Sequence, residues 1–357
     1  MLRAIAMLSV LVVNAMGYAV APWGEPLGAR TPADSAWAAT AQGLVAALLQ
    51  GKGYTTLAFV FGMALWLSSR RHTRAQALRR GKLRNGRLLS LGVVHGVFVY
   101  FGDILTMYAL LGRQLLHRLH QPWEPFRRHL GHALAWAVLA KLLLVAILLG
   151  VAERPPVVQG WSLSSVQGAW PFLKLNANTY ATTLLVGLIV SGPVLYFCML
   201  CGVAAARLRL LTHRRWRGVL LRVLQRVGVP LMGLALVLGI GEAMTVPSDA
   251  LRPWMDVLGE LIVVPMAGLY VVALAWASSG GRALWCHWLV PLGQRTLSLY
   301  VGHSLILLVL LSGAGLSLAL STVQVVVLCF GLWLLAGFVA RFSRYRRWPL
   351  EVWMGRR

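Results

Sequence analysis

The stretch Leu88–Gly112, LLSLGVVHGVFVYFGDILTMYALLG, decides the fold. It is apolar enough to cross a bilayer and begin to return, yet it contains His95 and Asp103. Ionisable groups at membrane depth are costly, so these two residues indicate a functional site. Eight helical residues rise by about 12 Å, which separates the two side chains along one straight helix. We therefore expect a shared cavity, and a direct His–Asp contact only where Gly102 breaks the helix.

The composition places this stretch in a membrane protein. Hydrophobic residues make up 58% of the 357 residues, charged residues 12%, and the mean hydropathy is +0.70. A soluble domain is not this apolar. The net charge of +24 therefore does not indicate a nucleic-acid partner. We predict an all-α, polytopic transmembrane helical bundle with about ten spans. The predicted spans are 3–21, 53–69, 88–101, 103–117, 133–150, 180–206, 227–244, 257–277, 289–311 and 316–340.

The positions of the basic residues predict how these spans cross the membrane. Lys and Arg collect in cytoplasmic loops. With a cytoplasmic N-terminus, one side of the membrane holds 28 of the 34 Lys and Arg residues. These residues are Arg3 and those in 70–87, 113–128, 207–226, 282–295 and 341–357. We therefore predict that both termini are cytoplasmic.

The rest of the chain is divided around this topology. We expect two transmembrane halves, 1–150 with five spans and 151–357 with five more. Within the second half, 207–226 alternates arginine with Leu, Val and Trp, which predicts a basic amphipathic helix along an anionic membrane face. We predict a loop at 151–178 and a surface helix at 36–50. Pro22 directly after a signal-like end favours a retained first span.

Five segments of the chain resemble the bacterial YeiB-like family of integral membrane proteins. They are Arg3 with Asn14, with ten residues between them; Lys52–Leu57 with Phe59–Gly62; His95-Gly96 with Gly102–Leu105 and Tyr108–Gly112; Gly293–Tyr300 with His303-Ser304; and Pro349–Glu351. This resemblance implies a multi-pass protein of the bacterial inner membrane. It also implies a relationship to the transmembrane acyltransferases, which include the lysosomal heparan glucosaminide acetyltransferase. Those enzymes move an acyl group from cytosolic acyl-CoA to an acceptor across the bilayer.

The chain also departs from these patterns. Ala4 stands where the family usually has Gly, His303 where Gln is common, and Trp348 where Gly is expected. The residues that usually precede Arg3 are missing, so we expect a trimmed or misassigned start. The loop after the first span lacks the histidine that is catalytic in the heparan enzyme. The mechanism of that enzyme therefore cannot be transferred directly.

Three residues are the candidates for catalysis. Acyl transfer from a thioester needs a base that deprotonates the acceptor and a donor that stabilises the oxyanion. His95 is the candidate base, Asp103 orients it or holds the acceptor, and Asn14 is the candidate oxyanion donor. The structural alternatives are a histidine bonded to a carbonyl, an interfacial aspartate and an asparagine that joins two helices.

Five further residues are candidates for binding. We assign Arg3 and Arg295 to the acyl-CoA donor, and Lys52, Tyr300 and His303 to the acceptor, which is a sugar, a lipid or another small molecule. No metal is expected. The structural alternative is that the cationic side chains contact lipid headgroups.

The function itself has two main alternatives at this stage. The first is an acyl-CoA-dependent membrane acyltransferase. The second is a transporter or channel for a small metabolite or lipid, for which paired broken helices in an inverted repeat would be typical. A structural partner of a membrane complex is a third. Lys141 in a membrane span needs a partner, for which Asp103 and Glu242 are candidates. Small-residue runs such as Gly313–Gly315 permit a homodimer.

Overall fold

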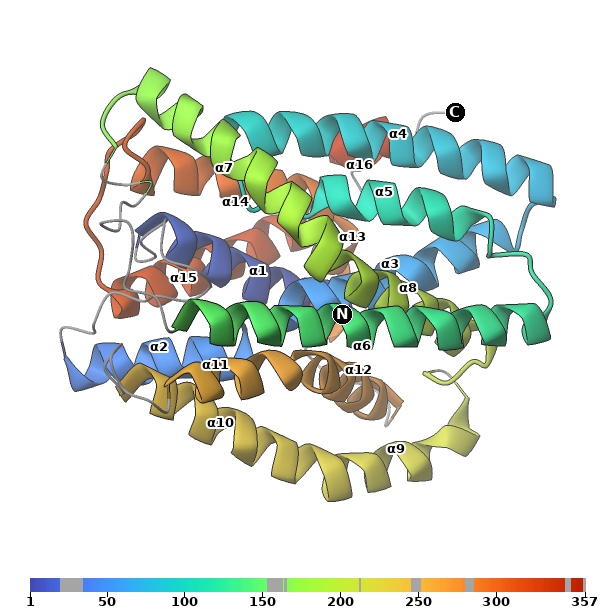
Figure 1. The fold of residues 1–357 in the computed structure, drawn as a ribbon. Helices are drawn as coiled ribbons and strands as arrows, with labels where there is room; N and C mark the ends of the chain where they lie inside the picture. Colours follow the sequence, from blue (N-terminus) through green and yellow to red (C-terminus); the bar gives the residue numbers. More distant parts are fainter. Residues whose placement is uncertain are drawn as a thin grey trace.

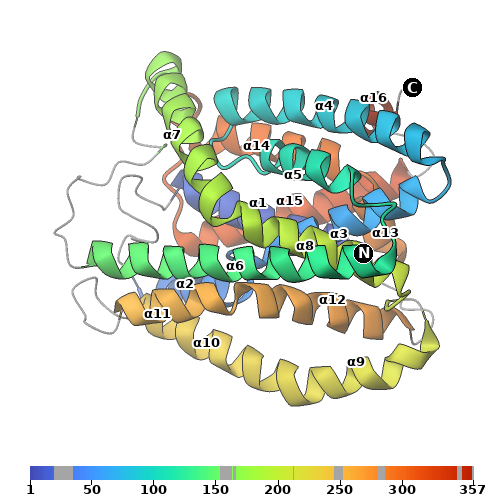
Figure 2. The ribbon, with the colours of Figure 1, turned by 45° about the vertical axis from the view of Figure 1, so that its right-hand side comes forward.

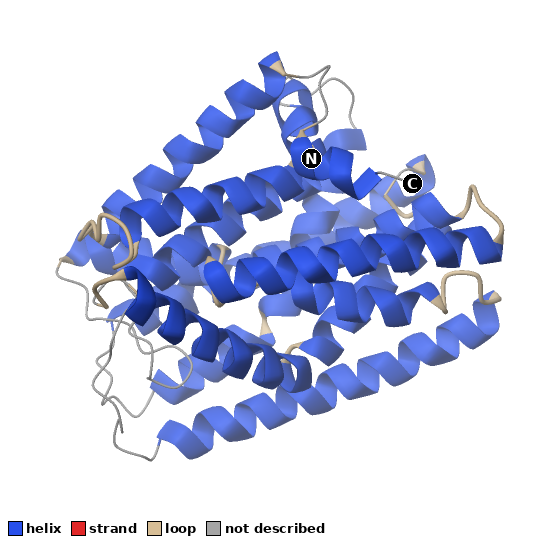
Figure 3. Cartoon of the chain, turned by 90° about the horizontal axis from the view of Figure 1, so that it is seen from above, coloured by secondary structure: helices blue, strands red, loops and turns tan. Residues whose placement is uncertain are grey.

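The computed structural model describes residues 1–19, 35–152, 163, 166–211, 213–244, 252–279, 286–343 and 348–355. These residues form helices and turns without a strand (Figures 1 and 3). The predicted all-α class is therefore confirmed. The α-helices are α1 (Leu2–Ala19), α2 (Ala36–Leu48), α3 (Lys52–Ser69), α4 (Arg74–Phe98), α5 (Leu105–Leu116), α6 (Trp123–Ala152), α7 (Ala169–Val190), α8 (Gly192–Arg207), α9 (Arg217–Val223), α10 (Val229–Met244), α11 (Arg252–Leu261), α12 (Val263–Ser279), α13 (Cys286–Gln294), α14 (Thr296–Leu311), α15 (Thr322–Phe342) and α16 (Pro349–Gly355).

Several of these helices are long and apolar enough to cross a membrane. Among the described residues there are five such helices, or up to seven when each of two bent helix pairs is counted as one span. The chain is thus a multi-pass membrane protein by the length and composition of its helices. The shorter α1 is also apolar. The count of about ten spans and the cytoplasmic location of the termini stay predictions.

Most of the helices run side by side, and α7 is tilted across the others (Figures 1 and 2). The first residues of α4, the turn before α9 and the short α16 all lie at the right-hand end of Figure 2. The described parts of two basic blocks, 70–87 and 207–226, therefore begin or turn at the same end of the bundle. Helices from the two predicted halves pack together, since α3 contacts α8 and α2 contacts α10.

Two helices are broken where the sequence predicts uninterrupted spans. Helices α7 and α8 meet at Ser191 with a bend of 60°, and α13 and α14 meet at Arg295 with a bend of 83°. Pro193 lies in the first turn of α8, and Pro291 lies inside α13. Proline lacks the N–H that an uninterrupted helix needs, which favours a break nearby. Helix α7 also begins well inside the predicted loop 151–178, so that part of the prediction is wrong.

Two further segments differ from their predictions. Helix α2 confirms a helix near 36–50, but the helix packs against α10 and α15 and buries Gln42 and Val45, among other residues. The segment 207–226 is not one helix. A turn follows α8, with Arg209 at a positive φ of 53°, and α9 then continues through a π-helical turn into α10. Residues 217–241 together are long and apolar enough to span the membrane.

Helices α3 and α8 approach each other closely. A Cβ atom on Gly62 would lie 2.0 Å from the backbone oxygen of Met199. A Cβ atom on Gly202 would lie 1.9 Å from the backbone oxygen of Phe59. Each helix thus offers a glycine to the backbone of the other, as small residues do where membrane helices pack closely.

Candidate active site

A chain reversal after α4 brings His95 and Asp103 together. Helix α4 ends at Phe98, and the N–H groups of Val99 and Tyr100 both donate to the carbonyl oxygen of His95. The chain then turns back toward α4 before α5 begins. His95 Nδ1 lies 3.0 Å from Asp103 Oδ1. The expected separation of about 12 Å is therefore wrong, because the two residues do not share one straight helix.

A glycine in α4 makes room for this reversal. A Cβ atom on Gly92 would lie 2.5 Å from the backbone nitrogen of Thr106 and 2.9 Å from Asp103 Oδ2. Gly92 lies nearly one helical turn before His95, on the same side of α4. The returning chain can thus lie directly against the backbone of α4, which carries Asp103 to the imidazole.

The pair is buried and its hydrogen bonds define its chemistry. The side chains of His95 and Asp103 are 1% and 0% exposed. Asp103 Oδ2 accepts the backbone N–H of Thr106 at 2.8 Å. An ionised carboxylate only accepts, so the proton of a neutral His95 lies on Nδ1. His95 Nε2 then holds a lone pair, and it has no hydrogen-bond partner in the described part of the chain.

Asn176 of α7 holds the reversal, and sequence reasoning missed it. Its Nδ2 donates to the carbonyl oxygens of Gly96 and Val97 at 2.9 and 2.8 Å. Its Oδ1 accepts the N–H of Phe101 at 2.8 Å, and the residue is fully buried. One side chain thus satisfies three backbone groups at the end of α4. An asparagine within a predicted loop gave no signal of this role.

We expect Asn176→Ala to lower the free energy of unfolding by about 3 kcal/mol, because three buried backbone groups lose their partner. The measurement is thermal unfolding in detergent. The matched control is Asn178→Ala, since Asn178 is exposed on the same helix. Equal stability of the two variants would contradict this role for Asn176.

Tyr300 of α14 contacts both members of the His95–Asp103 pair. Its ring centroid is 4.7 Å from that of His95, and its hydroxyl is 3.5 Å from Asp103 Oδ1. Tyr300 is 3% exposed. It was predicted to bind the acceptor, and in the structure it contacts the pair and also lines a cavity.

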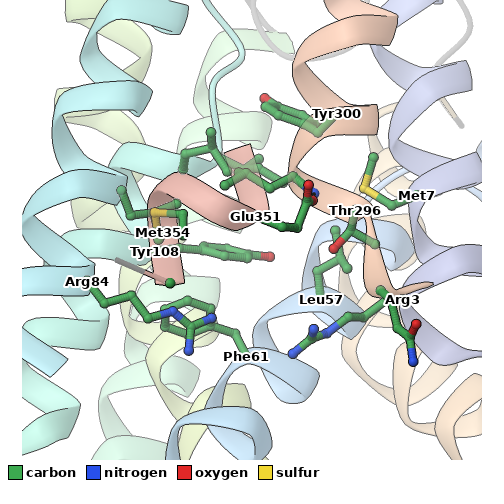
Figure 4. Close-up of a pocket in the computed structure, with 16 residues that line it drawn as sticks. Arg3, Met7, Leu57, Phe61, Arg84, Tyr108, Thr296, Tyr300, Glu351 and Met354 are labelled. Atoms are coloured by element: carbon green, nitrogen blue, oxygen red, sulfur yellow. Dashed lines mark hydrogen bonds between the residues drawn. The ribbon is translucent and has the colours of Figure 1, made fainter. Parts of the chain in front are cut away.

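The cavity has a volume of about 430 Å³ and is lined by residues from seven helices: α1, α3, α4, α5, α13, α14 and α16. Arg3 of α1 and Arg84 of α4 give it two guanidinium groups, and Tyr300 and Tyr108 lie deeper along its wall (Figure 4). Glu351 of α16 also lines it. Burial lowers the pKa of the Arg84 guanidinium from its ordinary value. In the described residues, no ion pair joins either arginine to a carboxylate. The cavity therefore favours an anion.

The structure places the other predicted site residues around this core. Asn14 and His303 line a narrow space on the far side of Tyr300. His303 is 6% exposed, and its Nδ1 has no partner among the described residues. Arg295 does not line the cavity, since its guanidinium donates to the carbonyl oxygens of Pro291 and Ser343 at 2.9 and 2.6 Å. Arg295 thus joins the break between α13 and α14 to the end of α15.

Lys52 lies at a second cavity of about 450 Å³. It is 3% exposed, and its Nζ donates to the carbonyl oxygen of Ala46 at 2.7 Å. Glu260, which lines this cavity, accepts Lys141 Nζ at 2.8 Å. Lys141 thus has a partner, and it is neither of the two predicted ones.

Tyr54 lines the second cavity, and its carbonyl oxygen accepts the hydroxyl of Tyr108 from the first. This hydrogen bond therefore connects the walls of the two cavities.

Residues 205–356 match a family described as a protein of unknown function (DUF418). The matched region contains α14, Tyr300 and Glu351 but neither His95 nor Asp103. No curated protein and no solved structure matches the chain. The resemblance to the YeiB-like family and to the acyltransferases stays a prediction.

Proposed function

We propose that this protein is a membrane-embedded acyltransferase. It would move an acyl group, such as acetyl, from cytosolic acyl-CoA to an acceptor at or across the membrane. The observation that carries the proposal is the buried His95–Asp103 pair, whose Nε2 has no partner among the described residues, in contact with Tyr300 in the wall of a cationic cavity. A histidine held by a carboxylate through Nδ1, with Nε2 free, is the arrangement of a general base.

The proposed reaction begins with a proton transfer to His95 Nε2. The acceptor hydroxyl or amine gives up this proton as its oxygen or nitrogen attacks the thioester carbonyl. Asp103 stabilises the imidazolium that forms, as the neighbouring carboxylate does in comparable sites. The C–S bond then breaks, and the CoA thiolate takes the proton from the imidazolium to leave as the thiol. The acceptor would approach Nε2 past Tyr300, whose ring contacts that of His95 and lines the cavity.

The charge of the cavity fits the donor. Arg3 and Arg84 would contact the phosphates of acyl-CoA at the basic end of the bundle, while the acyl end reaches toward Tyr300. Guanidinium groups suit phosphates because they offer several donors in one plane. This orientation follows the predicted topology of about ten spans with both termini in the cytoplasm. The inner membrane location rests on the resemblance to the YeiB-like family.

The first test is the binding of acetyl-CoA to the purified protein in lipid nanodiscs, measured by calorimetry. We expect Arg84→Met to weaken binding by about tenfold or more, because a charged hydrogen bond to phosphate is lost. Arg79→Met is the matched control, since Arg79 is exposed on the same helix. Absence of acetyl-CoA binding to the unmodified protein would overturn the proposed donor.

A transporter is the second candidate, and two observations favour it. A hydrogen bond from Tyr108 to Tyr54 connects the walls of the two cavities, and two helix pairs are sharply bent. Broken helices that surround a central site are typical of transporters. A buried His–Asp pair would then carry a coupled proton. Uptake of a solute by liposomes, abolished by His95→Ala without any transfer of label from acetyl-CoA, would favour this candidate over the first.

A further inference from the structure

The short C-terminal helix α16 crosses the cavity and inserts a carboxylate beside α14. Glu351 Oε1 accepts the backbone N–H groups of Leu297 and Ser298, both at 3.0 Å. Its Oε2 accepts the hydroxyl of Ser298. Figure 4 shows Glu351 above the space between Arg3 and Arg84. The carboxylate thus occupies the position that an anion would take at this end of the cavity.

This position favours negative charge for two independent reasons. The first N–H groups of a helix lack intrahelical partners and carry a partial positive charge. In addition, Arg3 and Arg84 line the same cavity, and neither forms an ion pair in the described part of the chain. Glu351 therefore fills, from within the chain, a place suited to the phosphate of a ligand.

Helix α16 is otherwise weakly attached. None of its residues is buried, and it is only seven residues long. Its other polar contacts are the hydrogen bonds from Arg87 to the carbonyl oxygen of Trp353, at 3.0 Å, and from the Leu350 N–H to Ser298 Oγ, at 3.3 Å. Among its apolar side chains Met354 packs against the main hydrophobic cluster, but it is only partly buried. The helix can therefore leave its place without exposing a fully buried side chain of its own, and the Glu351 contacts help to hold it.

We propose that α16 is a displaceable strap, closed over the cavity by Glu351 and opened when the phosphate of a ligand takes the place of the carboxylate. The ligand class rests on the proposed function, which makes it acyl-CoA. Glu351 would then lower the affinity for the donor and keep the empty cavity closed. The strap itself is a property of the fold and can be tested without acyl-CoA.

The first experiment measures access to the cavity with an introduced thiol. Thr296→Cys, in the cavity wall, is labelled in phosphatidylcholine nanodiscs with an anionic and with a neutral methanethiosulfonate reagent. The native cysteines are measured in the unmodified chain and subtracted. We expect Glu351→Ala to raise both labelling rates by about fivefold, the factor that corresponds to ~1 kcal/mol for a charge at a helix end. Glu351→Gln should have a smaller effect.

The controls separate opening of the strap from a change of charge. Val352→Ala, at an exposed position of α16, should leave both rates unchanged. A rise with the anionic reagent alone would reveal a charge effect and overturn the strap. Ser298→Ala removes one contact of Glu351 and the acceptor of the Leu350 N–H but keeps the charge of Glu351, and it should raise both rates by about twofold. If Glu351→Ala does not elute as a single species in size-exclusion chromatography, Ser298→Ala replaces it as the test of the strap.

The second experiment measures the dissociation constant of coenzyme A by calorimetry. We expect Glu351→Ala to bind about five times more tightly than the unmodified chain. Unchanged affinity would overturn the competition between Glu351 and the donor. Absence of binding to both proteins would overturn the proposed donor, whereas the labelling rates would still decide on the strap.

Repeating the labelling in nanodiscs with phosphatidylglycerol shows whether a lipid phosphate opens the strap instead, which would overturn acyl-CoA as its ligand.

Discussion

Asp103→Asn should retain the fold and the donor site but lose transfer of acyl groups by about a thousandfold, the scale of general acid–base catalysis. The substitution hardly changes the shape of the side chain. Its effect should come from the proton on His95, which the neighbouring group determines. Among the substitutions proposed for the candidate site, this one is expected to have the largest effect on activity.

The reason lies in the two partners of Asp103. The N–H of Thr106 donates to Oδ2, so an asparagine at this position must turn its carbonyl oxygen toward Thr106. Its NH₂ group then faces His95 Nδ1, where Oδ1 lies in the native protein at 3.0 Å. An NH₂ group donates, so Nδ1 must accept and the proton must move to Nε2. The lone pair needed for a general base is then lost from Nε2.

Transfer is measured with radiolabelled acetyl-CoA and a panel of sugar and lipid acceptors in proteoliposomes. Glu124→Gln is the control, because Glu124 is an exposed carboxylate paired with Arg127. Calorimetry with coenzyme A shows whether the donor site is intact. Transfer by Asp103→Asn at more than a third of the native rate, with normal donor binding, would remove His95 from the role of base.

The pairing of His95 with Asp103 was not predictable from their spacing. Apolar composition and two ionisable residues were enough to mark the stretch as a candidate site. The contact depends on a helix end at Phe98, on the space left by Gly92 and on Asn176, which comes from a helix about eighty residues later. Such a long-range hydrogen bond leaves no periodic pattern in the sequence.

The all-α class, in contrast, was predictable from the composition. Long apolar segments can satisfy their backbone in a membrane only as helices or closed barrels, so composition determines the class. The breaks at Ser191 and Arg295 were not predictable from apolar length, because both segments remain apolar through the bend. Hydropathy indicates that a segment lies within the membrane, but it does not give the direction of the helix axis. The short α16 shows the same limit, since the position of Glu351 depends on the N-terminus of α14.

Gly202→Ala should lower the free energy of unfolding by about 3 kcal/mol or more, although it adds a single methyl group. The new Cβ would lie 1.9 Å from the carbonyl oxygen of Phe59, far inside ordinary contact. The obstacle is backbone, so no side chain can rotate away, and α3 and α8 must separate. Alanine otherwise favours a helix over glycine by up to ~1 kcal/mol, which makes the expected sign opposite to the helix propensity.

The separation of α3 from α8 should also reach the candidate site, which distinguishes this prediction from a purely local clash. Helix α3 supplies Leu57 and Phe61 to the wall of the cationic cavity. Gly202→Ala should therefore weaken coenzyme A binding as well as thermal stability. Gly331→Ala is the control, because a Cβ atom there would meet nothing within 4 Å. Thermal unfolding in detergent and calorimetry measure the two effects. Equal stability of Gly202→Ala and Gly331→Ala would show that the two helices do not approach as closely as their glycines allow.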